Sequence, residues 1–237
     1  MRQAESVMPS DEKGPRSFVR DVETISAITL LSRVLGLVRD CACAAAFGVG
    51  PVWDAFSFAF RVPNLFRRLF GEGALSAAFV PAFTGTLELE GKEAACRLGG
   101  RVVGTLAVAL VLCLALGEGM AIGLLRWGGL PERWRLTLGL TAVLLPYMLL
   151  ICLTAVAGAA LNSMRHFAAP AAAPVVLNLI WIAAVLGVAP RVAQSRAGQA
   201  YVVSVAILVA GAFQLCLQAA VLRAKGCRFP PAFAPLH

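Results

Sequence analysis

Six long runs of apolar residues, separated by short stretches rich in polar residues, glycine or proline, constrain what this chain can fold into. A helix needs about 20 mostly apolar residues in succession to cross the hydrocarbon core of a bilayer. The runs reach this length, and they cover residues 25–47, 53–86, 100–122, 136–162, 168–189 and 199–223. The sequence therefore predicts an all-α fold, a polytopic bundle of about six transmembrane helices.

The composition agrees with a bilayer as the solvent. Of 237 residues, 59% are apolar and 14% are charged, and the mean hydropathy is +0.79. Soluble domains are roughly 45–50% apolar and 25% charged. We predict one transmembrane lobe at 25–225, between a polar tail at 1–24 and a proline-rich tail at 226–237. We expect the first tail to be disordered and uncleaved, because it holds no recognisable signal peptide.

Several function classes have little support. The net charge of +8 is spread over tails, loops and membrane segments, so no single basic face predicts nucleic-acid binding. The seven cysteines form no CxxC pair and lie mostly in apolar runs, so we expect neither a zinc site nor a disulfide framework. Because no HExxH, GxSxG or P-loop motif occurs, we predict no enzyme activity, metal or cofactor.

The basic residues outside the first two runs predict the orientation in the membrane. With six spans, one side carries eleven of them: Arg2, Lys13, Arg16, Arg20, Lys92, Arg97, Arg101, Arg165, Arg223, Lys225 and Arg228. The other side carries five: Arg126, Arg133, Arg135, Arg191 and Arg196. Positive charge is retained on the cytoplasmic side. We therefore expect a multi-pass membrane protein with both termini in the cytoplasm.

Arginines inside the first two apolar runs are the sharpest functional signal. Five such residues are present: Arg33, Arg39, Arg61, Arg67 and Arg68. Each costs about 2.5–3.5 kcal/mol at the centre of a membrane helix. The acidic residues beside them are fewer, namely Asp40, Asp54 and Glu72. The excess of positive charge predicts an anionic ligand, and guanidinium groups suit phosphate because they stay charged and donate in a planar fork.

Helical periodicity predicts how these charges are arranged. Asp54, Arg61, Arg68 and Glu72 fall on one stripe of the second run, although Pro63 is expected to kink it. The adjacent Asn64 and the Gly71–Gly73 step add polar or flexible backbone, which predicts an aqueous cleft.

The alternative for this set is structural ion pairs or snorkelling, with Arg39 and Asp40 as a brace or gate. Asn162 and Asn178 either line the cleft or serve as caps and interhelical hydrogen-bonding groups.

Several motifs occur in order along the chain. They are SRVLGLVRD at 32–40, DAF at 54–56, PNLFRRLFGEGA at 63–74, FVP at 79–81, PYMLL at 146–150, and LNS at 161–163 with Leu177-Asn178. Over about residues 25–225 the chain resembles the MurJ (MviN) lipid II flippase family of the MOP exporter superfamily.

The resemblance implies a six-helix N-terminal lobe, half of a two-lobed transporter that moves lipid II outward by alternating access. It implies that the family's functional residues match Arg33, Arg39, Asp54, Arg67 and Arg68, with Glu72 in the same motif, and that the protein lies in the bacterial inner membrane. We expect Arg33, Arg39, Arg67 and Arg68, with Asn64, to bind the diphosphate of lipid II. We expect ion-pair or gating roles for Asp40, Asp54, Arg61 and Glu72. Expected partners are lipid II, membrane lipid and a separate C-terminal lobe.

The second lobe of the family is missing from this chain, which leaves other functions open. One is export of a different polyprenyl-diphosphate glycan or a drug by a related exporter. Another is an inactive membrane remnant or scaffold.

Overall fold

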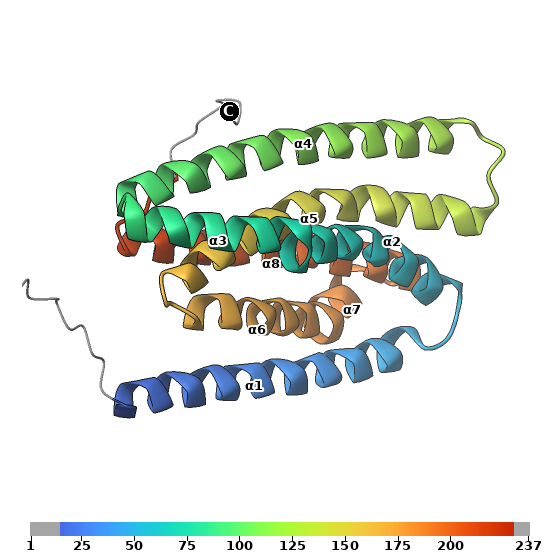
Figure 1. The fold of residues 1–237 in the computed structure, drawn as a ribbon. Coiled ribbons are helices and arrows are strands. Elements are labelled where there is room, and N and C mark those ends of the chain that lie inside the picture. Colours follow the sequence, from blue (N-terminus) through green and yellow to red (C-terminus); the bar gives the residue numbers. More distant parts are fainter. Residues whose placement is uncertain (1–14, 230–237) are drawn as a thin grey trace, which may run out of the picture.

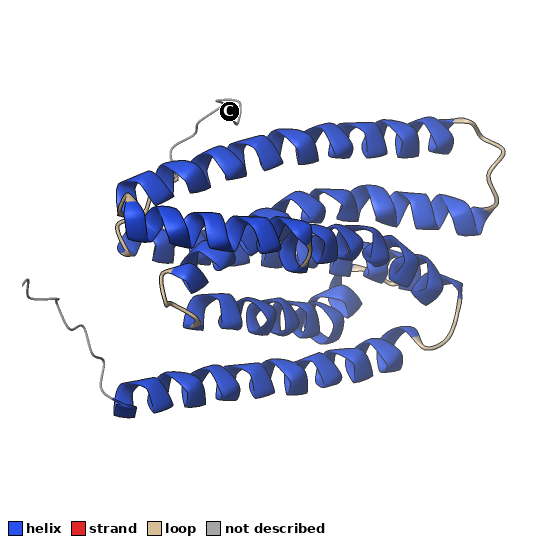
Figure 2. Ribbon diagram, in the orientation of Figure 1, coloured by secondary structure: helices blue, strands red, loops and turns tan. Residues whose placement is uncertain are grey.

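The computed structural model describes the backbone of residues 15–229, and within that range it leaves out the side chains of 15–22, Gly71, Glu72 and Ala74. The described part is helical and contains no strand (Figure 2). The predicted all-α fold is confirmed.

The helices make six antiparallel passes along the bundle (Figure 1). The first is α1 (Pro15–Phe47), and the second combines α2 (Pro51–Arg67), a π-helical turn η1 (Arg68–Glu72) and α3 (Ala74–Leu89). The third and fourth are α4 (Lys92–Arg126) and α5 (Glu132–Ser163). The fifth joins α6 (Ala168–Ala183), a π-helical turn η2 (Ala184–Val188) and α7 (Ala189–Val192), and the sixth is α8 (Arg196–Ala224). The start of α1 and the end of α8 therefore lie at the same end of the bundle.

Four passes within the described residues are long and apolar enough to cross a membrane: α4, α5, α6 through α7, and α8. The first two passes do not meet that standard. α1 carries Arg33, Arg39 and Asp40, while α2 and α3 have only 17 and 16 residues. The two passes that hold the intramembrane charges are thus the ones that depart from a plain apolar helix.

The core surrounds α5, which packs against α2, α4 and α8. Leu140, Leu144 and Tyr147 of α5 are almost fully buried. Small residues allow the close approach: a side chain at Gly211 of α8 would lie 2.8 Å from the Tyr147 ring. Without a hydrophobic driving force between helices in lipid, this close packing stabilises the bundle.

Helix boundaries differ from the prediction at three places. α1 begins at Pro15 instead of Ile25, so the expected polar tail supplies its first turns. α2 continues through Pro63, and the second pass is interrupted at Gly73 instead. The fifth pass continues past Pro190 to Val192, because Pro190 lies in the first turn of α7, where its missing N–H costs nothing.

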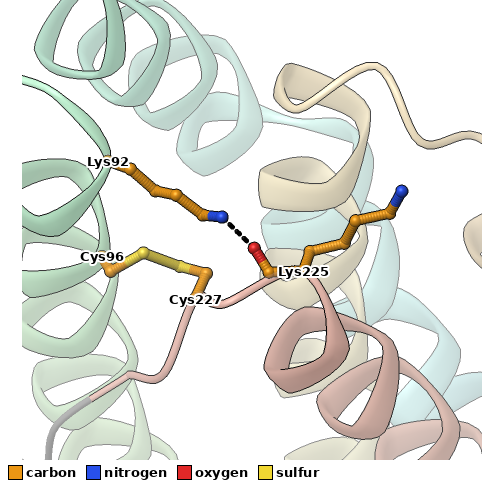
Figure 3. The surroundings of a disulfide bond; sticks show 4 residues. All are labelled: Lys92, Cys96, Lys225 and Cys227. Carbon is orange, nitrogen blue, oxygen red and sulfur yellow. Dashed lines mark hydrogen bonds between the residues drawn. A yellow bond between two sulfur atoms is a disulfide. The ribbon is translucent and has the colours of Figure 1, made fainter.

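The expectation of no disulfide is wrong for one pair of cysteines. Cys96 in α4 bonds to Cys227, which follows α8, with 5.6 Å between their Cα atoms (Figure 3). The two residues are 131 positions apart, so no local spacing indicated the pairing. The basic residues predict that this end of the bundle lies in the cytoplasm, where disulfides are rare. The disulfide therefore disagrees with the predicted orientation.

Candidate functional site

A cavity of about 610 Å³ lies among α2, α3, α5, α6 and α8, with one residue of α1 on its wall. Its walls carry many polar side chains for a site inside a membrane bundle. They are Arg39, Asn64, Arg67, Ser76, Tyr147, Thr154, Asn162, Asn178, Gln214 and Gln218. Apolar residues such as Phe60 and Ile151 complete the wall. Two cationic groups from different helices thus share one partly enclosed space.

Arg39 of α1 is held from three sides. Its Nε and Nη2 donate to Oδ1 of Asp40 at 3.0 and 2.8 Å, and its Nη1 donates to Oδ1 of Asn178 at 3.0 Å. The guanidinium carbon lies 4.8 Å from the centre of the Trp181 ring, within the range of a cation–π interaction. These bonds use three of the five guanidinium N–H groups, so two remain for a ligand.

Asn178 connects this group to the helix backbone. Its Nδ2 donates to the carbonyl oxygen of Ser32 in α1 at 3.1 Å, while its Oδ1 accepts from Arg39. The side chain is buried, and it also lies on the cavity wall. Both predicted alternatives for Asn178 therefore hold, since it makes interhelical hydrogen bonds and lines the cavity.

Arg67 reaches the same cavity from the end of α2. Its Nε donates to Oδ1 of Asn64, one turn earlier, at 2.9 Å. Asn64 and Arg67 lie three residues apart, so they share a face of the helix. That face is directed at the cavity, because Phe60, Asn64 and Arg67 all line it.

Two amide side chains of α8 lie in the cavity wall and were not predicted from the sequence. Gln214 and Gln218 are 1% and 2% exposed, and the Oε1 atom of each has no hydrogen-bond partner. Nε2 of Gln214 donates to the carbonyl oxygen of Ala173. Their spacing of four in an apolar helix was an available signal, because polar residues rarely lie inside membrane helices without a function.

The structure does not bring all predicted residues together. Arg33, Arg61, Arg68 and Asp54 are exposed on the surface of this chain, outside the cavity. Asp40 is also exposed but contacts Arg39 through the ion pair. The side chain of Glu72 lies outside the described residues. The described members of the predicted stripe, Asp54, Arg61 and Arg68, are therefore exposed and lie outside the cavity.

Most of the chain matches a known protein family. The sequence pattern of the family described as "Lipid II flippase MurJ" matches residues 43–236. The chain belongs to the MurJ lipid II flippase family. Its members include a probable lipid II flippase MurJ from Rhizobium tropici, 41% identical over 90% of this chain and 42% of the relative. The lipid II flippase MurJ of Burkholderia cenocepacia is 37% identical over 85% of this chain and 39% of the relative.

A solved structure supports the fold. The structure titled "Lipid II flippase MurJ, inward closed conformation" is similar over 89% of this chain and 43% of that chain, with a TM-score of 0.66 and 24% identity. The chain spans about two fifths of the length of the MurJ relatives it matches. Family membership and the apolar helices show a multi-pass protein of the inner membrane.

Proposed function

We propose that this chain forms one lobe of a lipid II flippase and binds the diphosphate of lipid II through Arg39 and Arg67. The observation that carries this proposal is that two arginines, from α1 and α2, line one cavity in a membrane bundle. Charge inside a bilayer is costly and is retained where it contributes to a substrate pathway. Membership of the MurJ family names lipid II as the anionic lipid that this charge would bind.

The geometry around Arg39 suits a diphosphate. Asp40, Asn178 and Trp181 hold the guanidinium in one orientation, so little side-chain freedom is lost when an anion binds. Two N–H groups remain to donate to phosphate oxygens. Charge-assisted hydrogen bonds of this kind are roughly twice as strong as neutral ones. Arg67, held by its hydrogen bond to Asn64, supplies the second positive group of the same cavity.

The second pass also carries exposed charges. Asp54 and Arg61 of α2 and Arg68 of η1 have no partner within this chain's described residues. A lipid-facing position would be costly for them, and a protein or water-filled neighbour would lower that cost. We propose that a second lobe, equivalent to the remaining length of the relatives, faces this stripe. Transport then requires both lobes, with Arg33, Arg68, Asp54 and Glu72 acting where they meet.

A complementation experiment tests this proposal. The chain is joined to the remaining length of the Burkholderia cenocepacia relative and produced in a bacterium depleted of its own lipid II flippase. We expect the joined protein to restore growth, and Arg39→Ala or Arg67→Ala to abolish it. Arg126→Ala, at the far end of α4, is the control and should retain growth. Full growth with both cavity arginines replaced would contradict the proposal.

A further inference from the structure

A second cavity, of about 940 Å³, lies between the first turns of α4 and the last turns of α8. It is at the end of the bundle where α1 begins and α8 ends (Figure 1), and its lining residues differ from those of the Arg39 cavity. Three arginines line it: Arg97 of α4, Arg223 of α8 and Arg228 of the segment that follows. The proposed binding of lipid II uses none of them.

The segment after α8 shapes this cavity by folding back onto α4. Nζ of Lys92 donates to the backbone carbonyl of Lys225, and Cys96 bonds to Cys227 (Figure 3). Phe229 lies so close to Gly99 that any side chain at that position would overlap its ring. Three separate contacts therefore hold residues 225–229 in place, and they fix Arg228 on the cavity wall.

The charge of the cavity is unbalanced. Against the three arginines stands one acidic residue, Glu93, and within residues 23–229 no ion pair involves any of the four. The first N–H groups of α4 add positive potential, because Gly91 provides no side-chain cap. An anion is therefore favoured here.

The other half of the wall is apolar. Ala219, Leu222 and Phe229 face the same cavity as the arginines. A transmembrane helix ends near the level of the lipid headgroups, and α8 ends at Ala224. The wall thus offers cationic groups at headgroup depth and apolar groups beside them. Free phosphate would contact only the cationic groups, whereas a phospholipid would contact the cationic groups through its headgroup and the apolar groups through its acyl chains.

We propose that this cavity binds the phosphate headgroup of an anionic membrane phospholipid, with the start of an acyl chain against Leu222 and Phe229. Basic cavities between membrane helices are a recurrent way to bind such headgroups. The site is independent of the proposed lipid II cavity, because it shares no residue with it.

Native mass spectrometry of the purified 237-residue chain tests the proposal. The chain is released from micelles that contain phosphatidylglycerol or, at equal concentration, zwitterionic phosphatidylcholine. The test variant combines Arg97→Gln with Arg228→Gln. The control is Arg126→Gln, an exposed arginine at the opposite end of the same helix. A third arm adds millimolar inorganic phosphate to the chain with bound phosphatidylglycerol.

We expect phosphatidylglycerol to bind at least tenfold more tightly than phosphatidylcholine. The double variant should weaken phosphatidylglycerol binding about thirtyfold, at roughly a fivefold loss per arginine near a membrane surface. The Arg126→Gln control should bind as the unchanged chain does. Equal binding of the two lipids overturns the proposal, as does a double variant that binds like the control. Displacement of the lipid by inorganic phosphate would also overturn it, because the apolar wall would then contribute nothing.

Discussion

At the scale of single residues, Arg39 shows how a charge is accommodated at membrane depth. Its side chain is 24% exposed, and Asp40, Asn178 and Trp181 surround the guanidinium. Asn178 is central to this arrangement because one small amide satisfies two groups of α1, the guanidinium of Arg39 and the carbonyl of Ser32. Buried polar groups of this kind are costly when a partner is removed.

Replacing Asn178 should therefore destabilise the chain more than replacing another asparagine of the cavity. We expect Asn178→Ala to lower the free energy of unfolding by about 1–3 kcal/mol, the cost of leaving buried partners unsatisfied. Asn162→Ala is the control, because Asn162 is exposed at the cavity wall. Thermal unfolding in detergent, followed by circular dichroism, measures both. Equal losses for the two variants would show that the Asn178 hydrogen bonds contribute little.

At this scale the sequence reveals the charged residues of the cavity but not its neutral ones. Charged residues in apolar runs are visible without a structure, so all five arginines were candidates, and Arg39 and Arg67 do line the cavity. Periodicity shows which residues share a face of a helix, but not whether that face points to the cavity or to the outside. It therefore could not separate Arg39 and Arg67 from Arg33, Arg61 and Arg68. Gln214 and Gln218 were missed since neutral amides disturb a hydropathy profile less than charges do.

At the scale of elements, the second pass is the unusual one. The sequence predicted one long helix at 53–86 with a kink at Pro63. Pro63 removes one backbone hydrogen bond, and α2 continues around it with the ring buried in the core. The interruption comes instead after the π-helical turn η1, where Gly73 has φ −100° and ψ −143° and precedes α3. Arg67 is the last residue of α2 and Arg68 the first of η1, so both lie within two turns of this break.

Gly73 is needed at this break because of a close backbone approach. A Cβ atom there would lie 2.5 Å from the carbonyl oxygen of Leu69, so Gly73→Ala must distort η1. We expect it to lower the free energy of unfolding by about 1–3 kcal/mol, as overpacking does. Gly85→Ala, in α3, meets no atom within 4 Å and should be neutral or stabilising by up to about 1 kcal/mol. Urea or thermal unfolding of both variants gives the comparison, and a stable Gly73→Ala protein would contradict this account of the break.

At the scale of the whole molecule, the described residues form one bundle of six passes built around α5. The number of passes followed from the spacing of apolar runs, because hydrophobic length is a strong constraint in a bilayer. The Cys96–Cys227 bond and the return of residues 225–229 onto α4 did not, since they join segments 131 positions apart. Contacts of that range depend on how the helices are arranged in space, which no single-sequence pattern records.

The central claim, that Arg39 and Arg67 bind a lipid diphosphate in the cavity, is tested most directly by lipid II binding to the purified chain in nanodiscs. Each charge-assisted hydrogen bond contributes about 1.5–3 kcal/mol, so we expect Arg39→Gln with Arg67→Gln to weaken binding at least tenfold. Arg61→Gln, an exposed position in α2 outside the cavity, should bind lipid II as the unchanged chain does. Unchanged affinity in a folded double variant, or an equal loss with Arg61→Gln, would contradict the account.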